Sequence, residues 1–301
     1  MNKSTKKIHI VKPHPDAIEM LRARQLGGPK IAHGFRPNPA LNLQQGQGRT
    51  LVALQFKNCY LGHWADTDMT NIDRALSGAL TDPNLNHVIQ QYFPSPVTTH
   101  FLGSTLRGDS SLTPASNFDR DAVSRTLASM DLTGIDATNT VICFYLPPGV
   151  VLDTHSMRGV GDEKDDKDNS LQGLGGYHGS ADLLGKEVLF AVAVYSQAMG
   201  RKINGIPFWP DSWKNVVATM YHELNEARTN PDVEKVNRTG DDKYLGWYSP
   251  AQGGGEIGDI PLNEAGSNLG LVLVEVPLVA GGTAPIQLMW SNEVSGPCGP
   301  Y

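Results

Sequence analysis

The residues with the clearest chemical potential lie in the segment 221–226, which reads Tyr-His-Glu-Leu-Asn-Glu. On a helix, His222 and Glu226 would lie one above the other, because side chains at positions i and i+4 share a face. A His-Glu-x-x-His helix uses this spacing to present two metal ligands, with the intervening Glu beside a metal-bound water. Here Glu226 replaces the second His and Glu223 is the intervening carboxylate. The six residues therefore fit either a metal site or an ordinary solvated helix face.

The segment lies within a predicted amphipathic helix over residues 211–229. Asp211 or Ser212 can cap its N-terminus, and Pro231 ends it because proline cannot continue the hydrogen-bond ladder. The two candidate ligands are expected roughly opposite the apolar stripe. That stripe follows the i, i+3, i+4, i+7 spacing of a half-buried helix and consists of Trp213, Val216, Val217, Met220, Tyr221, Leu224 and Ala227.

Strands and helices alternate along the rest of the chain without an internal repeat. This alternation predicts an α/β or α+β fold with a mixed central sheet and long loops. We expect residues 1–37 to form an extended N-terminal arm and residues 38–301 to form a single domain. Helices are predicted at 68–80, from 83 onward and at 119–130, and strands at 51–56, 140–146, 186–195, 269–276 and 286–290.

Composition limits the partners of the chain. Its 301 residues carry a net charge of −6, which does not favour a nucleic-acid surface. No apolar run is long enough to cross a membrane, and the basic N-terminus lacks the apolar core of a signal peptide, which predicts a cytoplasmic protein. The three widely spaced cysteines, Cys59, Cys143 and Cys298, argue against a disulfide framework. The sequence predicts no particular oligomeric state.

A polar loop over residues 153–176 is a second, weaker metal candidate. Its alternating carboxylates offer the oxygen ligands that Ca²⁺ prefers. The spacing of an EF-hand is absent, however, and dense charge is more typical of a solvated loop, so Ca²⁺ is expected less than Zn²⁺. The residues concerned are Asp162, Glu163, Asp165, Asp166, Asp168 and Asn169.

Several segments, taken in order, resemble one family. They are 140–149, Gly-Tyr-His-Gly-Ser at 176–180, His-Glu-Leu-Asn-Glu-Ala-Arg-Thr-Asn-Pro at 222–231, Gly-Trp-Tyr at 246–248, Glu-Ile-Gly-Asp at 256–259 and 287–292. The series resembles the plant phosphate-induced, EXORDIUM-like proteins and their bacterial relatives over roughly residues 38–301. The resemblance implies a zincin-like domain with a His-Glu-x-x-Glu helix, in a family mostly known as secreted and growth-associated. This chain departs from it in lacking a signal peptide and in carrying Ile260-Pro261 where a cysteine commonly follows.

The resemblance favours a metal site and leaves its ligand set open. His178, in a Gly-Tyr-His-Gly segment expected to be a turn, would complete a His₂Glu set with His222 and Glu226 and leave a net charge of +1 on a zinc site. Asp259 or Glu256 would instead give a neutral site. Such a site should lower the pKa of a bound water less, and it would suit a structural metal or a harder cation. We expect residues 253–259 to fold back over the helix face.

The favoured function is a metal-dependent hydrolase of zincin type acting on peptide bonds. Glu223 would take a proton from the metal-bound water and pass it to the leaving group. The partner would then be a peptide or another small polymer, with no nucleic acid and no membrane. The alternatives are a non-catalytic EXORDIUM-like protein with a structural metal, or a carbohydrate- or cell-wall-binding module. The last rests on tryptophans whose positions look exposed, Trp64, Trp209, Trp213 and Trp247, although Trp213 is expected to pack in the core.

Overall fold

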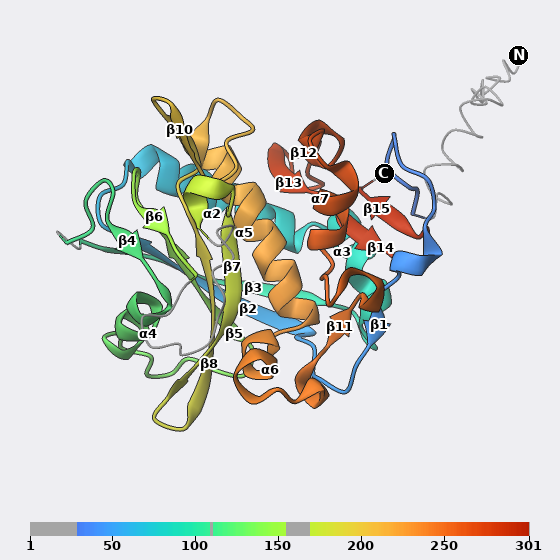
Figure 1. The fold of residues 1–301 in the computed structure, drawn as a ribbon, viewed down its shortest axis with the longest axis horizontal. Helices are drawn as coiled ribbons and strands as arrows, with labels where there is room; N and C mark the ends of the chain where they lie inside the picture. The colour runs from blue at the N-terminus through green and yellow to red at the C-terminus, as the bar shows by residue number, and fades with distance from the viewer. Residues whose placement is uncertain (1–28, 109–110, 155–168, 301) are drawn as a thin grey trace, which may run out of the picture.

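A computed structural model describes residues 29–108, 111–154 and 169–300 of the chain (Figure 1). Most of the predicted N-terminal arm lies outside these ranges. The same holds for the acidic residues between 162 and 168 that were considered as Ca²⁺ ligands. Within the described part, Ile31 forms an isolated bridge with Cys298, so the described end of the arm lies against the C-terminal segment.

The centre of the molecule is a five-stranded mixed sheet in the order β3-β2-β5-β8-β7. Four strands are parallel, and only the edge strand β7 runs antiparallel to its neighbour β8. The molecule is thus α/β with a mixed central sheet, as predicted. The bounds are β2 Ala53–Leu61, β3 Thr98–Arg107, β5 Thr140–Tyr145, β7 Gly176–Leu183 and β8 Lys186–Ala193.

Helices cover both faces of this sheet. The helices α2 (Asp66–Thr81) and α5 (Ser212–Thr229) pack together on one face, and α4 (Arg120–Ala128) packs on the other. Strand β5 is buried along its whole length for this reason. Its side chains alternate between two cores: Val141, Cys143 and Tyr145 face α5, whereas Ile142 and Phe144 face α4.

The C-terminal third adds a second layer over α5, visible as the orange-to-red segments of Figure 1. The hairpin of β12 (Leu273–Pro277) and β13 (Thr283–Gln287) packs on α5. The predicted strand 269–276 begins late, because residues 269–271 form a 3-10 turn, and the predicted strand 286–290 is divided between β13 and the next strand. The remaining helices are α3 Pro83–Ile89, α6 Val233–Thr239 and α7 Asp259–Ala265, and the short strands are β1 Gln44–Gln45, β4 Asn117–Phe118, β6 Val151–Leu152, β9 Gln197–Met199, β10 Lys202–Asn204, β11 Trp247–Tyr248, β14 Met289–Ser291 and β15 Gly296–Cys298.

Two expectations from the sequence are wrong. The Gly-Tyr-His-Gly segment is part of strand β7 and not a turn, because it pairs with β8 from Gly176 to Leu183. The tryptophans at 64, 209 and 247 are partly buried and pack against the core, which removes the observation behind the carbohydrate-binding alternative. Trp213 also packs against the core, as expected.

The three cysteines are free and buried. In the part of the chain that the structure describes, no helix combines the length and the apolar character that crossing a membrane requires.

Candidate metal centre

Helix α5 carries the candidate residues into the interior. It begins after Asp211 and ends at Asn230, which confirms the predicted helix. Its polar face is not solvated: His222, Glu223 and Glu226 are only 7%, 5% and 3% exposed. The expectation of an ordinary solvated face is therefore wrong. The reason is that β7 covers one flank of this face and β13, with the loop before α7, covers the other.

The imidazole of His222 is fixed in one orientation by Gln287. The Gln287 side chain donates from Nε2 to the carbonyl oxygen of Gly258 at 2.6 Å, so its Oε1 is left to face His222 Nδ1 at 2.9 Å. An amide oxygen can only accept, and therefore Nδ1 carries a proton. In the neutral ring, the lone pair then lies on Nε2, which is the arrangement found in histidines that bind metals.

Glu226 is held in position by the start of α7. Its Oε1 accepts hydrogen bonds from the backbone N–H groups of Gly258 and Asp259, both at 3.1 Å, and lies 3.0 Å from His222 Nε2. The absence of a side chain at residue 258 makes this approach possible. A Cβ atom there would lie 2.5 Å from His222 Nδ1.

Asp259 completes a first group of ligand atoms. Its Oδ1 lies 3.8 Å from His222 Nε2, so His222, Glu226 and Asp259 converge on one point. The side chain of Asp259 is 45% exposed, so the otherwise buried cluster contacts solvent at this residue. Repulsion from Glu226, followed by burial, raises the pKa of Asp259 to about 6.

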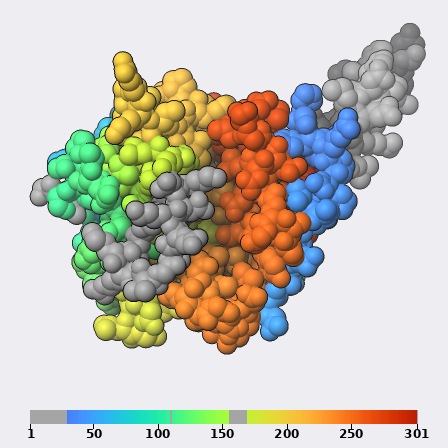
Figure 2. Space-filling view, viewed as in Figure 1, coloured from blue at the N-terminus to red at the C-terminus, as the bar shows by residue number. Residues whose placement is uncertain are grey.

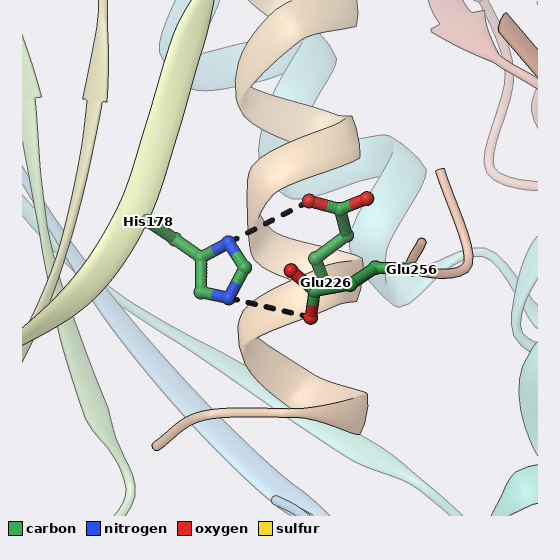
Figure 3. Close-up of side chains that lie close together, drawn as sticks. All are labelled: His178, Glu226 and Glu256. Carbon is green, nitrogen blue, oxygen red and sulfur yellow. Dashed lines mark ion pairs between the residues drawn. The ribbon is translucent and has the colours of Figure 1, made fainter. Parts of the chain in front are cut away.

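His178 lies on β7, and each of its two ring nitrogens faces a carboxylate, Glu226 and Glu256 (Figure 3). Its Nδ1 lies 3.4 Å from Glu223 Oε2 and 3.6 Å from Glu226 Oε2. Its Nε2 lies 3.3 Å from the carbonyl oxygen of Asn230 and 3.7 Å from Glu256 Oε1. Burial alone would lower the pKa of His178, but the surrounding carboxylates raise it well above the usual value. Acceptors lie near both ring nitrogens, which favours the doubly protonated, charged ring in the metal-free protein.

Glu256 comes from the loop before α7 and lies on the same side of His178 as Glu226 (Figure 3). It is 8% exposed and accepts a hydrogen bond from Asn230 Nδ2 at 2.8 Å. Burial, followed by repulsion from Glu226 and Asp259, raises the pKa of Glu256 well above its usual value. The loop before α7 thus lies over the helix face and brings in both of its carboxylates, but they join different groups. Asp259 joins His222, whereas Glu256 joins His178, and Glu226 belongs to both.

The two imidazoles and four carboxylates of the site, His178, His222, Glu223, Glu226, Glu256 and Asp259, carry an excess of negative charge when ionised. A bound cation would neutralise it. Four carboxylates face two imidazoles, so the fully ionised set carries two excess negative charges even when both rings are protonated. Without a cation, the raised pKa of Glu256 lets a proton neutralise one of these charges. Among the described residues lining the pocket, the only other cation is Arg120, and it pairs with Glu234. Buried charges are stable only when paired or bound to metal, so the donor set fits one divalent ion.

The cluster lies at the floor of a pocket with a volume of about 340 Å³. The pocket is bounded by α5, by the start of β7 and by the loop before α7. Figure 2 shows the orange-to-red C-terminal segments on one side and the yellow-green and gold segments on the other, and residues of both sides line the pocket.

Three residues of the site escaped the sequence analysis as individuals. Gln287, Gly258 and Asn230 contact the two imidazoles and the carboxylates of Glu226 and Glu256, although each lay within a segment that carried the family resemblance. A neutral amide or a glycine carries no chemical signal of its own, so only the proximity of those segments to the His-Glu-x-x-Glu motif could have indicated them. Comparisons of the chain with protein-family models, curated proteins and solved structures found no match.

Proposed function

We propose that the chain is a zincin-like, EXORDIUM-like hydrolase in which His222, Glu226 and Asp259 hold one divalent cation, with Zn²⁺ first among candidates. The observation that carries the proposal is the convergence on His222 Nε2. That atom, aligned by Gln287, has carboxylate oxygens at 3.0 and 3.8 Å. One imidazole and two carboxylates are ligands that zinc accepts, and three protein ligands leave a position open.

Glu223 is the base in this proposal. Its Oε1 lies 4.0 Å from His222 Nε2, beside the ligand group but outside it. A bound cation would supply Lewis acidity, polarising the substrate carbonyl and lowering the pKa of water. The Glu223 carboxylate accepts the proton of the attacking water and delivers it to the leaving nitrogen. The charged ring of His178, 3.4 Å from Glu223 Oε2, holds that carboxylate in position.

Among the strands that the structure describes, none pairs with the outer edge of β7, and this edge supports a peptide substrate. Gly175 accepts from Val194 across the β7–β8 ladder, whereas the carbonyl oxygen of Ser180 points outward to Arg238. Because the two sides of a strand alternate, Gly176 and His178 also direct their N–H and C=O groups outward, along the pocket. An extended peptide can add to such an edge as a further strand. The one antiparallel strand of the sheet thus lies where a peptide would pass over the cluster.

A second candidate, a non-catalytic protein with a structural metal, is favoured by the near-complete burial of His222 and Glu226. It predicts the same ion on the same residues with no turnover. The two candidates differ in the role of Glu223. A hydrolase needs that residue as a base, whereas a structural site needs it only as a buried partner of His178.

The test compares Glu223→Gln with Glu264→Gln in zinc-loaded protein on a broad library of fluorogenic peptides. Gln has nearly the shape of Glu but cannot accept a proton. We expect Glu223→Gln to retain the metal and to lose about 10²–10⁴-fold in turnover. Glu264 is exposed on α7, so its variant should match the wild type. A wild-type protein that binds zinc and cleaves no peptide would establish the structural candidate instead.

A further inference from the structure

A second hollow adjoins the pocket of the metal centre at the N-terminal end of α5. We call it the apolar groove; it has a volume of about 870 Å³. None of the described residues that line it carries a charge. This is unusual next to a cluster of four carboxylates, in a chain with a net charge of −6. Its apolar side chains are Leu171, Ile203, Ile206, Phe208, Leu262 and Leu269.

The groove and the pocket are continuous. Gly173, Ile206 and Leu262 line both of them. A chain lying over the metal centre along β7 would therefore enter the groove without crossing a barrier of charged side chains. The sharing of these residues makes the groove part of one binding surface with the pocket.

The groove exposes large apolar side chains to solvent. Ile203, at 54%, and Phe208, at 39%, are two of only five large hydrophobic residues in the described ranges that are exposed. Isolated exposed hydrophobics need no explanation, but their gathering on one concave surface marks a binding site. Leu106, which is 52% exposed, lies instead on β3 at the opposite edge of the sheet.

The segment around Phe208, which forms one wall of the groove, is hydrogen-bonded to helix α5. Asn215 on α5 is 2% exposed, and its Oδ1 accepts from the backbone N–H groups of Phe208 at 3.0 Å and Trp209 at 2.8 Å. His222 follows Asn215 by two helical turns on the same face, which places the two about 10 Å apart along the axis. An extended peptide spans that distance in about three residues.

We propose that the apolar groove binds a large apolar side chain of the peptide substrate, about three residues from the cleaved bond. This inference rests on the proposed hydrolase function and adds a substrate class to it. Chains with Leu, Ile, Met or Phe at that position bury the side chain against Ile203 and Phe208. Chains with a charged residue there leave the charge against an apolar wall that offers it no counter-ion.

The test uses the zinc-loaded full chain and quenched-fluorescent peptide libraries in which each position around the cleaved bond is varied. We expect an apolar residue about three positions from the cleaved bond to raise kcat/KM about 10- to 100-fold over Ser or Lys. The variants Ile203→Ser and Phe208→Ser should remove most of this preference. The melting temperature should change little in Ile203→Ser, because that side chain is 54% exposed, and should fall modestly in Phe208→Ser, because the Phe208 ring packs on Trp209. Leu106→Ser, an equally exposed control away from the groove, should keep the preference.

The outcomes separate the two proposals. Cleavage without an apolar preference near that position would overturn the groove inference and leave the hydrolase standing. A preference that survives both groove variants would also overturn it. The absence of any cleavage by the wild type would overturn the proposed function itself, and the groove inference with it.

Discussion

The two histidines of the cluster face the same carboxylate but have different partners. His222 has a neutral amide oxygen of Gln287 at Nδ1 and carboxylates only around Nε2. His178 has the carboxylates of Glu223 and Glu226 near Nδ1. Near Nε2 it has the backbone carbonyl of Asn230 and the carboxylate of Glu256. Both rings therefore have acceptors at both nitrogens and favour two protons in the metal-free protein. In our proposal a metal ion displaces the Nε2 proton of His222, whose neighbours at that atom are carboxylates, whereas Nε2 of His178 also lies beside a backbone carbonyl.

Because their surroundings differ, we expect His222 and His178 to have different roles. In our proposal His222 is a metal ligand. His178 is a protonated imidazole whose contacts hold the carboxylates of Glu223, Glu226 and Glu256 in place. Of the two ligand sets left open by the sequence, the geometry favours one histidine with two carboxylates, completed by Asp259. That set neutralises a divalent charge.

The largest expected effect separates the two rings directly. His222→Ala should weaken Zn²⁺ affinity by more than about 100-fold, beyond the range typical of residues that only support a ligand. His178→Gln should weaken it by no more than about 10- to 100-fold, because Gln can still donate to one carboxylate. Competition titration with a chromophoric chelator measures both. Equal losses of Zn²⁺ affinity in the two variants would contradict the assignment of His222 as ligand and His178 as non-ligand.

The second-largest effect on Zn²⁺ affinity is expected from Gln287, whose side-chain amide orients His222. In Gln287→Leu the buried Nδ1–H loses its acceptor, and the ring loses its fixed orientation. We expect Zn²⁺ affinity to fall about 10- to 100-fold, as for other groups that orient a metal-bound histidine. Gln44→Leu, an exposed change on β1, is the matched control. An unchanged affinity in Gln287→Leu would mean that Gln287 does not prepare the ring.

A steric change tests the close packing around the same ring. The Cβ of Gly258→Ala would lie 2.5 Å from His222 Nδ1, so the ring or the loop must move. Such overpacking costs about 1–3 kcal/mol of the free energy of unfolding. Urea denaturation of the metal-free protein measures it. Gly108→Ala, where a Cβ would meet nothing within 4 Å, should cost far less. If both variants unfold alike, the tight fit of the loop on His222 is disproved.

The pH dependence of metal binding should show protons leaving the first group. Burial alone would lower the pKa of His222, but Glu226 and Glu223 raise it well above the usual value, so a metal ion must displace a proton there. Affinity should then rise about tenfold per pH unit. Below about pH 6, the proton on Asp259 must leave as well, and the slope should steepen. Isothermal titration in buffers of different ionisation enthalpy counts these protons. A flat profile would show that neither group binds the ion.

How much of this could be read from the sequence differs between elements. Helix α5 and strand β5 were predicted, because periodicity and local end signals define them. Strand β7 was missed, because its Gly-rich segment becomes a strand only by pairing with β8. The loop before α7 was expected over the helix face, and the structure places it there.

The partition of the candidate ligands could not be read from the sequence. It depends on long-range contacts that no local pattern encodes. Gln287 lies 65 residues from His222, and His178 lies 45 residues from Glu223. The burial of the polar helix face likewise depends on the C-terminal layer that packs over it.

The most direct test of the central claim is a crystal structure of the zinc-loaded protein with anomalous data collected on both sides of the zinc absorption edge. We expect one anomalous peak, about 2.0–2.2 Å from His222 Nε2 and from carboxylate oxygens of Glu226 and Asp259, with His178 unbound. A peak coordinated by His178, or the absence of any peak at the cluster, would contradict the account.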